Sequence, residues 1–402
     1  MRSFLRALLM VTVMGAVFGL CSGGLHAATK HYVVTNDDVN GPNTVTFYLA
    51  GGTSSAPKLS RFRTISTGGT GLGGGYFGMV RQVFVEDHGT ECIFTADGGT
   101  SDIAGIRFST QKVVGNYKGS NTDSGGSAGI GLDLNPDGKY LYAAFAGSET
   151  IATFKIGSGC TLTFVSDIPA VGLNSGFPHG LASKGSMMVA AYGDGSIESF
   201  NISAGPPVSN HDLQLSTGFA KDRVFPDGVD ITKDGHYAIF GDASGGFSEV
   251  EVSDISSGKL AATVKYGGAD GSLGRGRAAN NVWLSPDETL LYVSDSLSGQ
   301  VTAAHFSKTT GKLHFGCISK PLRGFQSKWI YASAIASEHT SGTGSVLWVA
   351  EDGVGTFPSS IGFLEVRSNL GKCTLRESTK SPASDLKSMN LCWLNAFPQR
   401  PF

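Results

Sequence analysis

Short apolar runs alternate with turn residues along almost the whole chain. Two stretches align almost residue for residue: NPDGKYLYAAFAGSETIATFKIGSGCTLTFVS from Asn135 and SPDETLLYVSDSLSGQVTAAHFSKTTGKLHFGCIS from Ser285. Each holds a β-rich run, a Gly/Ser/Asp turn, a run in which apolar and polar residues alternate, and a third β-rich run. A period of two residues predicts β-strands, and no helical period lies between these runs.

Five weaker copies bring the number of units to seven. They begin near Lys30, Gly89, Gly185, Lys233 and Gly344, so that units start about 46 to 59 residues apart. A further apolar run, such as GIGLDL or NNVWL, precedes the turn that opens a unit, which gives four strands per unit. Such units are typical of propeller blades. The sequence therefore predicts an all-β fold, a seven-bladed β-propeller of four-stranded antiparallel blades, in one domain covering residues 28–402.

The two ends of the chain predict how the ring closes. Residues 388–397, SMNLCWLNAF, resemble the inner-strand run RAANNVWLSP, with Trp393 aligned to Trp283. The first unit, by contrast, starts directly with its second strand, HYVVTND. We expect residues 388–397 to supply the innermost strand of the blade formed by residues 31–67, which removes exposed strand edges.

The first 27 residues have the features of a cleaved secretory signal peptide. A basic start, MRSFLR, precedes an apolar stretch and a segment that ends in small residues before Ala28. The apolar stretch is shorter than the roughly 20 residues of a membrane span. The expected location of the mature protein is the periplasm or the cell exterior, without a membrane anchor.

Five cysteines follow this segment: Cys92, Cys160, Cys317, Cys373 and Cys392. In an oxidising compartment one or two disulfides are expected, with at least one thiol left over. The alternative is that the cysteines serve as small buried apolar residues.

Charge and composition exclude several kinds of function. Lys and Arg number 31 against 33 Asp and Glu, and no run of like charges occurs, which excludes the basic surface of a nucleic-acid or membrane binder. The nine histidines show no paired metal-ligand spacing, and the glycine-rich motifs are not followed by a helix that would bind a nucleotide. We expect no cofactor and no bound metal; a cation held by acids in the central channel is the alternative.

The start of each inner strand predicts a functional site. In a propeller, the loops that enter the inner strand and leave the second strand open on one face, around the central channel. Alignment of the inner strands places seven residues at one equivalent position: Arg81, Ile130, His179, Asp227, Asn280, Tyr331 and Asn390. Buried inner strands should be apolar, so this mostly polar ring predicts a ligand pocket at the channel mouth.

Within this ring, His179 is the candidate for proton transfer, because imidazole titrates near neutral pH. The alternatives are ligand contact without catalysis and a structural role. Arg275 and Arg277, in the loop GSLGRGRAANN, enter the same face. Together with Arg81 they form a set suited to a carboxylate or phosphate, with solvated loop arginines as the alternative. The expected partner is a small anionic molecule.

The ends of the second strands form another ring. Its members are Asn36, Asp97, Phe145, Tyr192, Asp242, Asp295 and Glu351. Acids at strand ends commonly accept hydrogen bonds in the turn that follows, so a structural role and a ligand-binding role both fit these positions.

The runs LYAAFAGSETIATFKI and LYVSDSLSGQVTAAHF, the NPDG and SPDE turns, and FPHG at 177–180 resemble those of the seven-bladed lactonase-type propellers. These include 6-phosphogluconolactonase-like proteins and the fungal 3-carboxy-cis,cis-muconate cyclases. The resemblance spans roughly residues 30–400 and implies that a His in a Pro-His turn is functional. Many members have a second His nearby, which this chain lacks.

Three functions follow from these observations. The first is an exported enzyme, a lactonase or muconate cyclase, in which Arg277 and Arg81 hold the substrate and His179 moves the proton. The second is a non-catalytic propeller that binds a small ligand or a protein partner at the channel mouth. The third is a scaffold of the cell envelope. Export disfavours a phosphorylated sugar lactone, because such intermediates belong to the cytoplasm.

Overall fold

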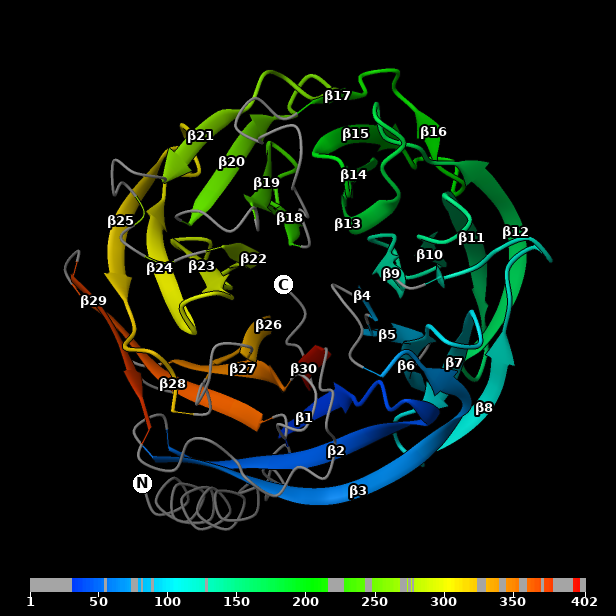
Figure 1. The fold of residues 1–402 in the computed structure, drawn as a ribbon, viewed down its shortest axis with the longest axis horizontal. Helices are drawn as coiled ribbons and strands as arrows, with labels where there is room; N and C mark the ends of the chain where they lie inside the picture. Colours follow the sequence, from blue (N-terminus) through cyan, green and yellow to red (C-terminus); the bar gives the residue numbers. More distant parts are fainter. Residues whose placement is uncertain are drawn as a thin grey trace, which may run out of the picture.

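The computed structural model describes most of the chain from residue 31 onward. The described residues are 31–53, 56–73, 79–80, 82–87, 90–126, 129–215, 228–242, 248–267, 273, 276, 278–323, 330–339, 345–353, 360–369, 372–378 and 393–397. They form seven sheets, antiparallel except for the short pair β4 and β9, and no α-helix. The sheets are arranged in a ring (Figure 1). The predicted signal peptide, residues 1–27, lies outside the described residues.

Each sheet is one blade, with its strands ordered from the ring centre outward. Blade 1 contains β30 (Trp393–Phe397), β1 (His31–Asn36), β2 (Gly41–Thr53) and β3 (Ala56–Gly71). Blade 2 contains β5 (Gln82–Asp87), β6 (Thr90–Asp97), β7 (Asp102–Arg107) and β8 (Lys112–Tyr117). Blade 3 contains β9 (Gly129–Leu134), β10 (Tyr140–Phe145), β11 (Thr150–Gly157) and β12 (Thr161–Pro169), with β4 (Met79–Val80) added beside β9.

The remaining blades follow in chain order. Blade 4 contains β13 (Pro178–Lys184), β14 (Met187–Tyr192) and β15 (Ser196–Asn201), with β16 (Val208–Ser209) and β17 (Gln214–Leu215) both paired to β15. Blade 5 contains β18 (Val229–Ile231), β19 (Tyr237–Asp242), β20 (Glu249–Asp254) and β21 (Val264–Gly267). Blade 6 contains β22 (Ala279–Leu284), β23 (Leu290–Asp295), β24 (Gln300–Phe306) and β25 (Leu313–Ile318). Blade 7 contains β26 (Ile330–His339), β27 (Ser345–Gly353), β28 (Ser360–Asn369) and β29 (Lys372–Glu377).

The repeated turns explain why the inner strands pair as they do. Between β9 and β10, the side chain of Asn135 accepts hydrogen bonds from the backbone N–H groups of Lys139 (2.9 Å) and Tyr140 (2.8 Å). Between β22 and β23, Ser285 Oγ accepts from the N–H of Leu290 at 3.0 Å. A short polar side chain at the start of the turn therefore closes it, as turn chemistry requires.

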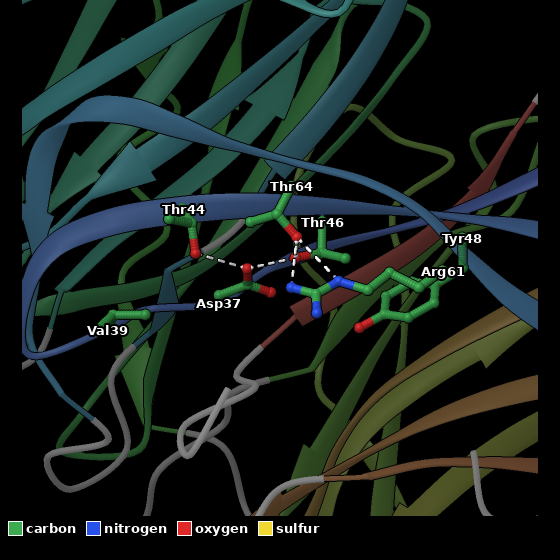
Figure 2. Close-up of a pocket in the computed structure, with 7 residues that line it drawn as sticks. All are labelled: Asp37, Val39, Thr44, Thr46, Tyr48, Arg61 and Thr64. Atoms are coloured by element: carbon green, nitrogen blue, oxygen red, sulfur yellow. Dashed lines mark hydrogen bonds between the residues drawn. The ribbon is translucent and has the colours of Figure 1, made fainter. Parts of the chain in front are cut away.

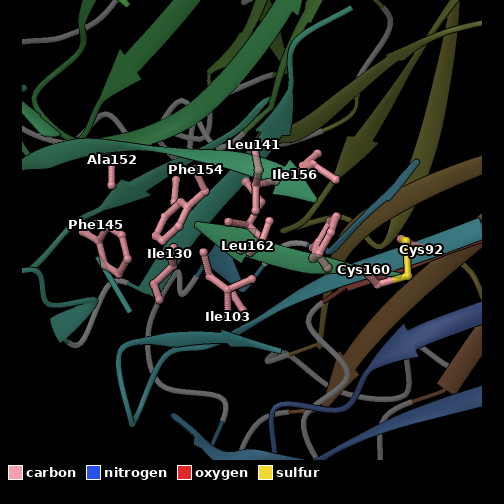
Figure 3. Packing of buried hydrophobic residues seen from close by; sticks show 14 residues of the cluster. Cys92, Ile103, Ile130, Leu141, Phe145, Ala152, Phe154, Ile156, Cys160 and Leu162 are labelled. Carbon is pink, nitrogen blue, oxygen red and sulfur yellow. A yellow bond between two sulfur atoms is a disulfide. The ribbon is translucent and has the colours of Figure 1, made fainter. Parts of the chain in front are cut away.

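The hydrophobic core lies between neighbouring blades. The cluster in Figure 3 joins residues of β6 and β7 to residues of β9–β12, including Phe94, Ile130 and Phe154, all fully buried. A disulfide between Cys92 and Cys160 lies at the edge of this cluster and joins blade 2 to blade 3. A second disulfide, Cys317–Cys373, joins β25 of blade 6 to β29 of blade 7. The expectation of one or two disulfides is confirmed, and Cys392 lies outside the described residues.

The two ends of the chain meet in blade 1. Strand β30 pairs antiparallel with β1, with Trp393 opposite Asn36 and Phe397 opposite Tyr32. The inner strands contact one another around the ring in the order β30, β5, β9, β13, β18, β22 and β26, and β26 contacts β30. The innermost strand of blade 1 thus comes from the C-terminal segment; residues 388–392 lie outside the described part of the chain.

The observed fold is the all-β, seven-bladed propeller that the repeat predicts, with two differences. Blades 3 and 4 each carry a fifth short strand, because β4 pairs parallel to β9 and β17 pairs with β15 beside β16. In addition, Trp393 lies opposite the last residue of β1, whereas Trp283 lies opposite Tyr292, three residues before the end of β23. The two tryptophans therefore do not occupy equivalent positions.

Candidate functional site

Three inner strands carry a β-bulge at the same place, near their first residues. The register shifts between Pro178 and Gly180 in β13, and between Ala279 and Asn281 in β22. It shifts again between Ala332 and Ala334 in β26. A bulge leaves one residue out of the ladder and changes the direction of its side chain. The three bulged residues are His179, Asn280 and Ser333.

The second strands confirm that these positions correspond. Tyr192, Asp295 and Glu351 lie opposite Pro178, Ala279 and Ala332, respectively, each beside a bulge. Tyr192 and Asp295 end their strands, whereas β27 continues for two residues beyond Glu351. The pairing places Ser333 at the equivalent position in β26. Tyr331, which alignment had placed there, lies two residues earlier and opposite Asp352. This corrects the alignment, which had no PDG or PDE turn to fix its register here, because the segment that follows Ser337 reads EHTSGTGS.

His179 is held in place by close packing. Its ring centroid lies 5.6 Å from that of Phe177, and the Phe177 carbonyl accepts a hydrogen bond from the N–H of Gly193 at 3.0 Å. A Cβ at Gly131 in β9 would lie 2.4 Å from the His179 carbonyl oxygen, so only glycine fits between these inner strands. The residue as a whole is 1% exposed, so its imidazole is buried. Direct proton transfer to a substrate therefore needs a rearrangement of its surroundings.

The segment that leads to Asn280 has a strained backbone and is held by hydrogen bonds. Ala278 has a φ of 58°, in the left-handed region that non-glycine residues rarely adopt. Its carbonyl accepts hydrogen bonds from the backbone N–H (2.9 Å) and the Oγ (3.1 Å) of Ser296. The N–H of Asn281 donates to Ser294 Oγ at 3.0 Å. Asn280 itself is buried. Backbone strain of this kind is commonly found at functional sites.

The other predicted site residues are mostly outside the described part of the chain. These are Arg81, Asp227, Arg275, Arg277 and Asn390. Gly276, between the two loop arginines, is described: a Cβ there would lie 2.2 Å from Asp295 Oδ2, and its carbonyl accepts from the N–H of Ser248 at 2.7 Å. The backbone at Gly276 therefore covers the end of β23, beside the bulge of β22.

The ring at the ends of the second strands is buried. Asp97 is fully buried and accepts hydrogen bonds from Asn43 Nδ2 at 2.7 Å and Thr67 Oγ1 at 2.8 Å, both from blade 1. Asp295 accepts from Thr302 Oγ1 at 2.7 Å, and Glu351 accepts from Ser360 Oγ. These donors are side chains of neighbouring strands, which supports the structural role of the three carboxylates.

Burial changes the protonation of these acids. Desolvation raises the pKa of Asp97, Asp295 and Glu351 to about 7 in each case, against the lowering effect of their hydrogen bonds. Glycines approach two of the carboxylates closely, since a Cβ at Gly69 would lie 2.5 Å from Asp97 Oδ2, and one at Gly362 would lie 2.7 Å from Glu351 Oε1. These acids are covered by protein.

Two further findings concern ligands and membranes. Within the described residues, no group of three or more His, Cys, Asp or Glu side chains could hold a metal ion. In the same part of the chain, no helix has the length and hydropathy that a membrane crossing needs.

Comparison with protein families and with curated proteins gives no match. Solved structures, by contrast, share the fold. The periplasmic gluconolactonase PpgL of Pseudomonas aeruginosa has a TM-score of 0.63 at 14% identity, over 92% of this chain and 99% of that protein. A candidate 6-phosphogluconolactonase from Bacteroides fragilis has a TM-score of 0.64 at 14% identity, with the same coverage of both chains.

Propellers of other functions are also similar. The WD40 repeats of RRP9 give a TM-score of 0.52 at 13% identity, over 81% of this chain and 89% of theirs. At these identities the comparisons define the class by its fold: a seven-bladed propeller of the architecture found in lactonase-type structures. The resemblance expected from the sequence is confirmed at that level.

Proposed function

We propose that the protein is an exported lactonase-type propeller that hydrolyses a small, unphosphorylated lactone where the inner strands begin. One observation carries the proposal: the same bulge recurs in three blades and takes His179 and Asn280 out of the ladder at one end of the ring. The strained φ of Ala278 beside Asn280 supports it. Cycloisomerisation of a carboxymuconate is the related reaction.

The chemistry needs few groups. Water adds to the lactone carbonyl, the ring C–O bond breaks, and the product is a hydroxy acid. His179 would take the proton from water and return it to the leaving ring oxygen. Arg277 would stabilise the negative charge on the carbonyl oxygen, and Arg81 and Arg275 would hold the carboxylate that forms in the product or that a carboxymuconate already carries. Asp227, Asn280 and Asn390 would bind substrate hydroxyls.

The name of one structural neighbour supports the choice of substrate. PpgL is a periplasmic gluconolactonase, which combines export with an unphosphorylated sugar lactone. The signal-like segment MRSFLRALLMVTVMGAVFGL predicts export for this chain as well.

The second candidate is a non-catalytic propeller that binds a small ligand or a protein. The burial of His179 favours it, because a buried imidazole fits a role in packing. The likeness to a WD40 propeller is consistent with this candidate, since the fold supports binding without catalysis.

Turnover assays distinguish the two candidates. The purified protein should be tested with glucono-1,5-lactone, other aldonolactones and carboxymuconates, next to His179→Gln, Asn280→Ala and Arg277→Ala. Loss of general acid–base catalysis should lower kcat by roughly 100-fold or more in His179→Gln. The matched control is His236→Gln, because His236 lies on a turn, with 56% of its side chain exposed.

The control should keep the activity of the parent protein, and thermal unfolding should show that every variant is folded. Unchanged turnover in folded His179→Gln would contradict the catalytic role of this residue. No turnover of any substrate by the folded parent would favour the binding propeller.

A further inference from the structure

A cavity lies in blade 1, outside the ring of inner-strand residues. It has a volume of about 90 Å³. The cavity is lined by Asp37, Val39, Thr44, Thr46, Tyr48, Arg61 and Thr64 (Figure 2). Asp37 directly follows Asn36, the last residue of β1, so the cavity lies at the same end of the blade as the proposed site.

The strand register explains why these side chains share one face. Thr44, Thr46 and Tyr48 alternate along β2, and the residues opposite Thr46 and Tyr48 in β3 are Thr64 and Arg61. A register shift between Phe47 and Tyr48 leaves Phe62 out of the ladder. Arg63 therefore lies opposite Phe47 and on the other face. The bulge at Phe62 turns Arg61 toward the cavity.

The hydroxyl groups form a chain with a fixed direction. Thr46 Oγ1 donates to Asp37 Oδ2 at 2.7 Å, so its only proton is used. In the 2.9 Å bond between Thr46 and Thr64, Thr64 is then the donor. Thr64 Oγ1 in turn accepts from Arg61 Nη2 at 2.8 Å and from Nε at 3.2 Å. Hydrogen-bond donation thus runs from Arg61 to Asp37.

Asp37 holds the far end of this chain. It also accepts from Thr44 Oγ1 at 2.7 Å and from Thr35 Oγ1 at 2.6 Å. Burial raises the pKa of Asp37, and the hydroxyl donors and the Arg61 charge act against this effect. The protons of Thr44 and Thr46 both point to Asp37. Toward a ligand, these two hydroxyls can therefore act only as hydrogen-bond acceptors, through their lone pairs.

Arg61, by contrast, can donate hydrogen bonds to a ligand. Among the described residues, its guanidinium donates only to Thr64, although it carries five N–H groups, and the side chain is exposed. A complementary ligand must present an anionic acceptor to Arg61 and hydrogen-bond donors to the threonines. A carboxylate with a neighbouring hydroxyl has both. From this arrangement we propose that the cavity binds a small hydroxycarboxylate, with its carboxylate on Arg61 and its hydroxyls on Thr44 and Thr46.

Binding measurements test this proposal independently of lactone turnover. Titration calorimetry at low ionic strength should use D-gluconate as the probe. Acetate, which has a carboxylate but no hydroxyl, and sorbitol, which has hydroxyls but no carboxylate, are the control ligands. Gluconate should bind at least tenfold more tightly than either. Arg61→Gln should weaken gluconate binding tenfold or more, because a charge-assisted contact is lost, and Thr44→Val should weaken it severalfold. Arg63→Gln is the matched control and should bind like the parent.

Three results would overturn the proposal. Acetate that binds as well as gluconate would show that the hydroxyls take no part. Equal losses in Arg61→Gln and Arg63→Gln would show only a general charge effect. Gluconate binding that survives Arg61→Gln and disappears in His179→Gln would place the acid at the inner strands. If the protein hydrolyses no lactone but binds gluconate through Arg61, the proposed lactonase function is rejected and the hydroxycarboxylate site in blade 1 is supported.

Discussion

At the scale of single residues, the acids that end the second strands show how burial decides their role. Asp295 is fully buried, accepts a hydrogen bond from Thr302, and lies under the backbone of Gly276. Its pKa rises to about 7 because burial removes water from the charged form. A carboxyl group that keeps its proton near neutral pH makes the stability of the protein depend on pH.

The sign of this dependence follows from the raised pKa. In the folded protein Asp295 holds its proton up to about pH 7, whereas in the unfolded chain it loses the proton near the ordinary value of 3.8. Its contribution to stability is therefore greatest at low pH and declines as the pH rises through about 7. Between pH 5.5 and pH 8, this one group should lower the free energy of unfolding by about 2 kcal/mol.

Urea unfolding of Asp295→Asn at the two pH values measures the effect. Asn preserves the shape without the titration, so the difference between pH 5.5 and pH 8 should shrink relative to the parent. The control is Asp254→Asn, an exposed acid whose pKa is lowered by hydrogen bonds from Ser256. A pH dependence in Asp295→Asn equal to that of the parent would contradict the assignment.

The sequence predicted His179 and Asn280 at corresponding positions, and the bulges in β13 and β22 confirm this correspondence. It missed Ser333, since the segment that follows this strand, EHTSGTGS, lacks the PDG or PDE sequence on which the clearest units align. The cavity at Asp37 and Arg61 was missed for a different reason: the bulge at Phe62 decides which face Arg61 occupies, and this bulge has no sequence pattern.

At the scale of the strands, the disulfides join blades that the core already packs together. Cys92 in β6 is 68 residues from Cys160, and Cys317 in β25 is 56 residues from Cys373. Sequence predicted that disulfides form, but their pairing depends on which segments of neighbouring blades face each other in the ring. That arrangement is a property of the closed fold, and the pairing cannot be inferred from the spacing of the cysteines in the sequence.

Each disulfide closes a long segment of chain, so its removal should lower the stability of the protein substantially. Replacing Cys92 and Cys160 together by Ala should lower the free energy of unfolding by about 4 kcal/mol, since the cross-link restricts the unfolded chain. Urea unfolding with and without a reductant checks this. The reductant should destabilise the parent, and a variant that lacks all four paired cysteines should not respond. An unfolding midpoint for the Cys92/Cys160 double variant equal to that of the oxidised parent would contradict the prediction.

At the scale of the whole molecule, the repeat was a reliable guide to architecture. Each unit contributes the same strand order whatever its individual residues, so seven copies predict seven blades. The added strands β4 and β17 were not predicted because each has only two residues, too few for a hydrophobic period.

Closure of the ring by β30 leads to a prediction for truncated proteins. A chain that ends after Cys392 lacks β30 and leaves β1 as an open edge beside β26 and β5, the neighbours of β30. This truncation should abolish cooperative unfolding or cause association through the exposed strand. The control ends after Phe397 and retains β30. Size-exclusion chromatography and urea unfolding compare the two, and equal behaviour would contradict a closing role for β30.

The same closure sets an order of events when the protein is made. Strands β1 to β3 are synthesised first, but their blade is completed by residues 393–397, close to the end of the chain. Blades 2 to 7 can form as their residues emerge, whereas blade 1 waits for a contact that spans nearly the whole sequence. During this interval the edge of β1 is available to other chains. A nascent molecule is therefore most exposed to misassembly at β1, until β30 has been synthesised.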